Sequence, residues 1–139
     1  MIAKLSVGLL ILDQLAKYVI RASMGFGESV PIIRNSFHIT LVQNTGAIFG
    51  MFRGQNMVFV WLSVMAIGLL LYEWERFPKG RVCQFLLVLI VTGLVSNLID
   101  RVLFGFVTDF LDFRVWPVFN FADAMVSVGV AGLVVKCLK

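Results

Sequence analysis

The feature that most constrains this chain is the length of its apolar runs without charge. No charged residue lies between Arg53 and Glu73, and none lies between Arg81 and Asp100. A helix needs about 20 mainly apolar residues to cross a bilayer, and each run approaches that length. The composition agrees, because 60% of the residues are hydrophobic and 14% are charged, against roughly 45–50% and about 25% in soluble domains. We therefore predict an integral membrane protein.

Two less regular stretches are also predicted to span the membrane. Residues 120–138 hold one acidic residue, Asp123, and residues 5–22 are interrupted by Asp13 and Lys17. The first stretch also resembles a secretory signal peptide, but no small-residue cleavage site follows it, so a retained helix is favoured. The predicted fold class is an all-α integral membrane protein, one domain over residues 1–139. Its expected spans are 5–22, 55–73, 82–100 and 120–138, with an outer loop at 27–53.

The outer loop is predicted to contain a small extracytoplasmic β-sheet. Phe37, Ile39 and Leu41 alternate with other residues in the period-two pattern of a strand, and residues 29–33 offer a partner before a turn at 34–36. Lys and Arg are denser at both chain ends and around residues 74–81 than in the long segments between, which places both termini in the cytoplasm. The net charge of +4 is scattered, so we do not expect a nucleic-acid partner.

Polar residues inside the predicted spans point to structure or function, because each costs free energy in a bilayer. Asp13 and Lys17 are four residues apart, a spacing that favours a structural ion pair. Asn97, Asp100 and Arg101 are predicted to share one face of the third helix, where Gly93 permits close helix approach. For Asp100 a structural charge network is the favoured interpretation.

Asp109 and Asp123 are candidates for chemistry at the outer membrane boundary. Asn120 is a plausible helix cap, but Asp123 lies a turn further in, where a cap does not explain it. Two close carboxylates share a proton, so one can accept a proton from water while the other polarises a carbonyl. Spacing alone leaves this aspartyl-protease hypothesis beside a small proton-coupled transporter, which uses intramembrane acids as a relay. A purely structural membrane subunit is a third class.

Other chemistries have less support in the sequence. His38 is the single histidine, which makes a metal site or a nucleophile with a histidine base improbable. No glycine-rich phosphate loop occurs in a strand–loop–helix context. We therefore expect no cofactor and no metal.

Five sequence blocks occur in an order that resembles one family. They are Asp13-Gln14-x-x-Lys17, Asn44-Thr45-Gly46-Ala47-x-Phe49, Gly93-x-x-x-Asn97-Leu98-Ile99-Asp100-Arg101, Val107-x-Asp109-Phe110 and Phe119-Asn120-x-Ala122-Asp123. Each block is weak alone, but together they cover nearly the whole chain. The sequence resembles the bacterial lipoprotein signal peptidases, also called signal peptidase II.

The resemblance implies an aspartic endopeptidase of the bacterial inner membrane, with its active site at the outer face. It would cleave prolipoproteins before a diacylglyceryl-modified cysteine, with Asp109 and Asp123 as the catalytic pair. The residues implied to support the pair or the substrate are Asn44, Gly46, Asn97, Arg101, Asn120, Asp13, Lys17 and Asp100. Expected partners are lipid-modified prolipoproteins, membrane lipids and cyclic peptide inhibitors of the globomycin type, and the expected state is a monomer.

The chain departs from the family pattern at a few positions. Ile48 stands where a small residue is usual, Ser96 and Thr92 each replace a glycine, and the connection over residues 110–119 is shorter than in familiar members. These changes leave the predicted pair intact, but they affect the expected pocket shape and the packing of the third helix.

Overall fold

The computed structural model describes residues 2–46 and 54–136. Within these ranges the long helices are α1 (Ile2–Ser23), α2 (Asn56–Tyr72), α3 (Arg81–Phe104) and α4 (Phe121–Lys136), with a short 3₁₀ turn, η2 (Trp74–Arg76). The strands are β1 (Ser29–Ile33), β2 (Phe37–Asn44) and β3 (Val107–Asp112). The bounds of these helices lie within a few residues of the four stretches that were predicted to span the membrane. Ile48, which was expected to affect the shape of the pocket, lies outside the described residues.

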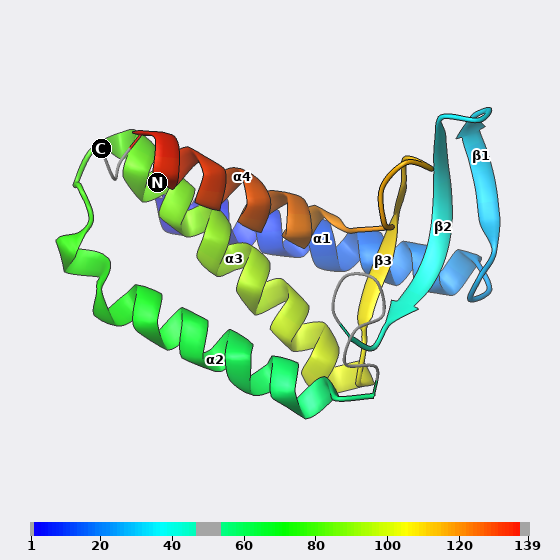
Figure 1. Cartoon of the computed structure of the whole chain (residues 1–139), viewed down its shortest axis with the longest axis horizontal. Helices are drawn as coiled ribbons and strands as arrows, with labels where there is room; N and C mark the ends of the chain where they lie inside the picture. Colours follow the sequence, from blue (N-terminus) through cyan, green and yellow to red (C-terminus); the bar gives the residue numbers. More distant parts are fainter. Residues whose placement is uncertain (1, 47–53, 137–139) are drawn as a thin grey trace.

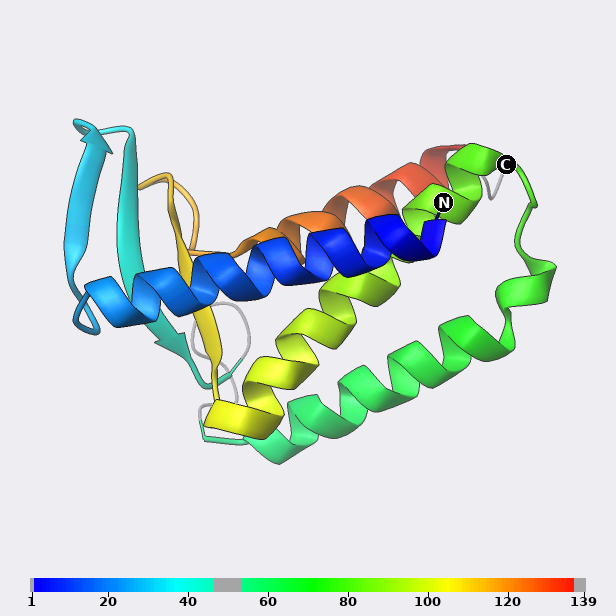
Figure 2. The same cartoon turned by 180° about the vertical axis from the view of Figure 1, so that it is seen from behind.

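The helices run side by side, and the sheet stands across one end of them (Figure 1). The start of α1 and the end of α4 lie together at the opposite end, as Figure 2 shows from behind. Helix α3 is central, because it packs against α1, α2 and α4. The structure therefore separates a helical body from a sheet that closes one end of it.

Close packing of α3 on α4 depends on glycine. A Cβ atom added at Gly93 would lie 2.5 Å from the carbonyl oxygen of Ala122, and one at Gly129 would lie 2.5 Å from Ile90 Cγ1. Any larger residue at either position would push the helices apart. The sequence expectation for Gly93 is confirmed, and the contact fixes the start of α4 against the middle of α3.

Helix α2 is apolar on every side, yet none of its residues is buried by the rest of the protein. Trp61 is 60% exposed and Met65 is 67% exposed. A helix of this kind is normally covered by protein or by lipid, so the exposed faces of α2 fit a bilayer. Among the described residues α3 alone is long and apolar enough to cross a membrane, and α2 is a shorter apolar helix. The count of four spans stays a prediction.

The sheet is antiparallel in the order β1-β2-β3. The two predicted strands of the outer loop are confirmed, and Asn35 makes the turn between them with a left-handed φ of 65°. The third strand was not predicted from the sequence. Helix α3 ends at Phe104 and is capped by Gly105, whose φ is 80°, and the chain then turns to pair β3 with β2. Consequently Asp109 lies on a strand that follows the third helix.

Candidate active site

A cavity of about 940 Å³ lies between the sheet and helices α2, α3 and α4. Asp109, from β3, and Asp123, from the first turn of α4, both lie on its wall. Asn44, Gly46, Asn97 and Arg101 line it too. Much of the remaining wall is apolar and comes from Val42, Phe59, Leu94, Phe113, Trp116, Pro117, Val118, Phe119, Ala124, Val126 and Val128. The cavity is therefore a largely apolar chamber with two carboxyl groups on one side.

Asp109 is almost completely buried, with 1% of its surface exposed. Asn120 Nδ2 donates to its Oδ1 at 2.7 Å, and Asn44 Nδ2 donates to its Oδ2 at 2.9 Å. Burial, together with the negative charge of Asp123, raises the pKa of Asp109 to about 7, although both amide donors act in the opposite direction. Asp109 can therefore hold or release a proton near neutral pH.

Asp123 takes part in the N-terminal cap of α4. Its backbone N–H donates to Asn120 Oδ1 at 2.9 Å, and the Asn120 N–H donates back to Asp123 Oδ2 at 3.3 Å. This reciprocal pair is a capping box, so the expectation that capping does not account for Asp123 is wrong. Its other oxygen accepts from Asn97 Nδ2 at 2.7 Å. The carboxylate is thus held by the helix start while still lining the cavity.

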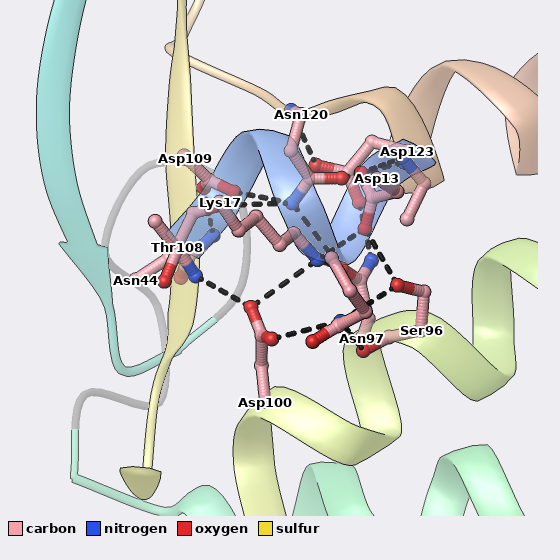
Figure 3. Close-up of polar contacts among 12 residues, drawn as sticks. Asp13, Lys17, Asn44, Ser96, Asn97, Asp100, Thr108, Asp109, Asn120 and Asp123 are labelled. Carbon is pink, nitrogen blue, oxygen red and sulfur yellow. Dashed lines mark hydrogen bonds and ion pairs between the residues drawn. The ribbon is translucent and has the colours of Figure 1, made fainter. Parts of the chain in front are cut away.

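Asn120 joins the two acids through different atoms. Its side-chain amide donates to Asp109 and its backbone N–H donates to Asp123, as the close-up in Figure 3 shows. Asn120 is fully buried, and its Nδ2 also lies 3.3 Å from the carbonyl oxygen of Thr108. One residue therefore fixes the position of both carboxyl groups relative to each other.

Behind this pair lies a second polar cluster around Lys17, which has no exposed surface. Lys17 Nζ lies 2.8 Å from Asp13 Oδ2 and 3.2 Å from Asp100 Oδ2, which confirms the predicted pair with Asp13. The same nitrogen donates to Asn97 Oδ1 at 3.0 Å. Because Asn97 in turn donates to Asp123, the lysine cluster and the carboxyl pair are connected through one amide (Figure 3).

In addition to the ion pair with Lys17, Asp13 and Asp100 each accept a hydrogen bond from a backbone N–H. Asp13 Oδ1 accepts from Ala122 N at 3.0 Å, and Asp100 Oδ2 accepts from Thr108 N at 3.0 Å. The first contact holds the start of α4, and the second holds β3 one residue before Asp109. Neither carboxylate lines the cavity. Their contacts are those of residues that position the strand and the helix.

Asp100 and Arg101 do not share one face of α3, contrary to the expectation. Asp100 points toward α1 and β3, whereas Arg101 lies over the Phe59 ring of α2 at 4.7 Å and lines the cavity. Neighbouring residues on a helix are about 100° apart, which explains the separation. Arg101 Nη2 reaches the carbonyl oxygen of Gly46 at 3.5 Å.

Four polar residues of the clusters were not predicted to belong to the site, namely Gln14, Ser96, Arg21 and Thr108. Gln14 donates to Ser96 and to Asp100, Ser96 donates to Asp13, and Arg21 donates to Thr108 Oγ1 at 2.7 Å. Gln14 belongs to the first motif block, so its place there was a usable signal. The contacts of Thr108 could not be anticipated because its strand was not. Among the described residues no group of three or more His, Cys, Asp or Glu side chains could hold a metal ion.

Comparison with known proteins defines the class of this molecule. The chain is similar to a solved structure described as a bacterial membrane enzyme, with a TM-score of 0.88 and 30% identity over 96% of this chain and 85% of that one. A second structure with the same description gives a TM-score of 0.85, at 30% identity over 96% and 90% of the two chains. The fold is therefore that of a bacterial membrane enzyme.

The sequence comparisons narrow this class to a family. The family model for signal peptidase (SPase) II matches residues 5–139. The lipoprotein signal peptidase of Halothermothrix orenii is 42% identical over 90% of this chain and 86% of that protein. The corresponding enzyme of Moorella thermoacetica is 42% identical over 91% and 85%. This chain belongs to the signal peptidase II family, and it is a bacterial membrane protease.

Proposed function

We propose that this protein is an aspartic endopeptidase that removes the signal peptide from lipid-modified prolipoproteins, with Asp109 and Asp123 as its catalytic pair. The observation that carries the proposal is that both carboxyl groups line one cavity and are joined through Asn120. Family membership supplies the reaction class, signal peptide removal from lipoproteins.

One carboxyl group of the pair acts as the general acid and the other as the general base. We assign the shared proton to Asp109 and the negative charge to Asp123, because Asp123 accepts donors from Asn97 and Asn120 and lies at the N-terminus of α4, where negative charge is favoured. Asp123 removes a proton from water, the resulting hydroxide attacks the scissile carbonyl carbon, and Asp109 protonates the carbonyl oxygen. The tetrahedral diol then returns a proton to Asp109 as the C–N bond breaks, and Asp123 protonates the leaving amine.

Arg101 and Asn44 are placed to hold the substrate backbone beside the pair. Arg101 Nη1 is buried and has no hydrogen-bond acceptor among the described residues, so a peptide carbonyl oxygen can supply one. Asn44 lines the cavity while it orients Asp109, and Gly46 follows it on the same wall. These groups favour a peptide in extended conformation along the end of β2.

The cavity suits a substrate that arrives through the bilayer. It is bounded by α2, α3 and α4 along its helical side and by the sheet at its far end, so a signal helix can lie along the apolar helices with its last residues at the acids. The sheet end then faces the outer side of the inner membrane and both termini face the cytoplasm. A monomer contains the whole pair, and a cyclic peptide of the globomycin type would fill the same chamber.

The test is cleavage of a lipid-modified prolipoprotein by purified protein in detergent, without an added ion or gradient. We expect Asp109→Asn and Asp123→Asn to lower the rate by about 10³-fold or more, since each removes one partner in proton transfer. Glu75→Gln, at a side chain 86% exposed, is the matched control and should cleave normally. Near-normal turnover by either folded pair variant would rule out the assignment. Lack of cleavage by the wild-type protein would overturn the proposed function.

A further inference from the structure

The connection between β3 and α4 forms one wall of the cavity, and the catalytic assignment does not use it. We call the cavity-lining residues of this connection, at positions 113 and 116–119, the aromatic wall. They are Phe113, Trp116, Pro117, Val118 and Phe119. In Figure 1 this connection folds back beside β2 at the sheet end of the molecule. The wall therefore lies at the sheet end of the molecule, between the strand that carries Asp109 and the helix that carries Asp123.

Backbone hydrogen bonds hold the two ends of the connection between β3 and α4 together. The N–H groups of Phe110 and Leu111 donate to the Phe119 carbonyl oxygen at 3.0 and 2.8 Å, and Phe119 N–H donates to Leu111 O at 3.1 Å. The rings of Phe113 and Phe119 are stacked with centroids 5.8 Å apart, and Phe113 also contacts Phe37 of β2 at 4.9 Å. The connection is thus an ordered closed loop fixed to the sheet.

Asp112 holds the base of this loop. It is 5% exposed and accepts from Thr40 Oγ1 at 2.7 Å and from Arg114 N at 2.8 Å. Arg114 adopts a left-handed φ of 65°, and its Nη1 lies 2.9 Å from Asp112 Oδ2. A left-handed backbone is unfavourable for a residue other than glycine. The two donors from Arg114 compensate for that cost, because they reach Asp112 only when the chain turns here.

The Asp112 carboxylate is separate from the catalytic pair in its electrostatics. Burial would raise its pKa, but the hydrogen bonds from Thr40 and Arg114 outweigh burial and hold the pKa below its ordinary value. Asp112 is therefore ionised at neutral pH and keeps its partners, whereas Asp109 is close to its midpoint. Asp112 does not line the cavity, whereas Asp109 does.

We propose that the aromatic wall binds the lipid attached to the substrate cysteine, and that Asp112 is a positioning residue that sets the shape of this wall. The proposal rests on the proposed function. A signal helix along α2, α3 and α4 leaves the cysteine that follows the cleaved bond at the sheet end of the molecule, where the wall lies. The wall is apolar, and its Trp116 is 61% exposed. Tryptophan at such a boundary packs its ring on apolar chains while its N–H stays hydrated.

The test compares two S-diacylglyceryl peptide substrates of the same sequence, one with palmitoyl chains and one with octanoyl chains. For Trp116→Ala we expect KM for the palmitoyl substrate to rise by about tenfold, with kcat within about twofold, because contact with several methylene groups is lost. The octanoyl substrate should be affected much less. Val115→Ala is the matched control, since Val115 is 91% exposed and is not a cavity-lining residue.

Asp112→Ala should reproduce the rise in KM for the palmitoyl substrate, and Thr40→Val should show the same change at smaller size. A role in general stability alone would lower the folded fraction and reduce kcat for both substrates equally. If Trp116→Ala leaves the ratio of the two KM values unchanged, the proposal is overturned, even when Asp112→Ala does not fold. Cleavage by the wild-type protein and its loss in Asp109→Asn report separately on the proposed function.

Discussion

The protein contains two pairs of aspartates, Asp13 with Asp100 and Asp109 with Asp123, that differ in what lies between them. Asp13 and Asp100 share the ammonium group of Lys17, at 2.8 and 3.2 Å. Asp109 and Asp123 share Asn120, an amide residue that carries no charge. An ammonium group compensates buried negative charge, whereas an amide only orients it and leaves the pair to share a proton. The same side chain is thus charge-compensated in one pair and, as we propose, takes part in proton transfer in the other.

The largest expected effect on stability comes from removing the shared cation. Lys17→Met leaves Asp13 and Asp100 buried without a compensating charge, so we expect the free energy of unfolding to fall by about 3–5 kcal/mol. Chemical or thermal unfolding in detergent measures it. Lys79→Met, at an ion pair whose side chains are 56% and 86% exposed, is the control and should change stability by at most about 1 kcal/mol.

A triple variant tests whether charge is the cause. Adding Asp13→Asn and Asp100→Asn to Lys17→Met removes the uncompensated charges, so it should recover part of the lost stability. A triple variant no more stable than Lys17→Met would contradict the role assigned to the cation.

The next largest effect is that an Asp→Asn substitution should change the free energy of unfolding in opposite directions in the two pairs. Asp100→Asn loses part of the acceptor set for Lys17, Gln14 and the Thr108 N–H, and should destabilise the protein by roughly 1–3 kcal/mol. Asp109→Asn should instead stabilise it at pH 8, by on the order of 1–2 kcal/mol, because an acid with a raised pKa is unfavourable when ionised.

The sign of the stability change for Asp109→Asn follows from the linkage between protonation and folding. The native pKa of Asp109, about 7, lies above its ordinary value of 3.8, so its contribution to stability is complete below pH 3.8 and is lost as pH rises toward 7. The gain from Asp109→Asn should therefore vanish near pH 4 and reach its full size above pH 7. Unfolding measured across this range checks it, and a gain independent of pH would contradict the shifted pKa.

The pH dependence of cleavage should report the same group. If the pair needs one proton, kcat/KM falls as pH rises through about 7, when Asp109 ionises. We expect about a tenfold fall for each pH unit above the midpoint. A rate that stays constant to pH 9 would contradict the assignment of Asp109 as the proton donor.

The smallest expected effect separates orientation from chemistry. Asn44 donates to Asp109 Oδ2 at 2.9 Å and lowers its pKa. Asn44→Ala should therefore shift the falling limb of the pH profile to higher pH and lower kcat by roughly tenfold. Gln43→Ala, at the exposed residue before it, is the control and should leave the midpoint unchanged.

Much of the framework could be predicted because local patterns determine it. The apolar stretches located the four long helices of the described residues, the period-two alternation located β1 and β2, and the i,i+4 spacing paired Asp13 with Lys17. Strand β3 could not be found this way. Its residues Val107–Asp112 are mostly buried on both faces, so they show no alternation, and the strand exists only because β2 is there to pair with it.

The sequence by itself determined that the chain is a membrane protein and which family its motif blocks resemble. It also identified the acidic residues in or near the predicted spans whose presence needs an explanation. Only the tertiary structure decided how those acids are divided. Asp100 and Asp109 are close in sequence, but the turn at Gly105 and the pairing of β3 with β2 send one to Lys17 and the other to Asn120. The environment of a carboxyl group depends on residues from distant parts of the chain, and the fold alone brings them together.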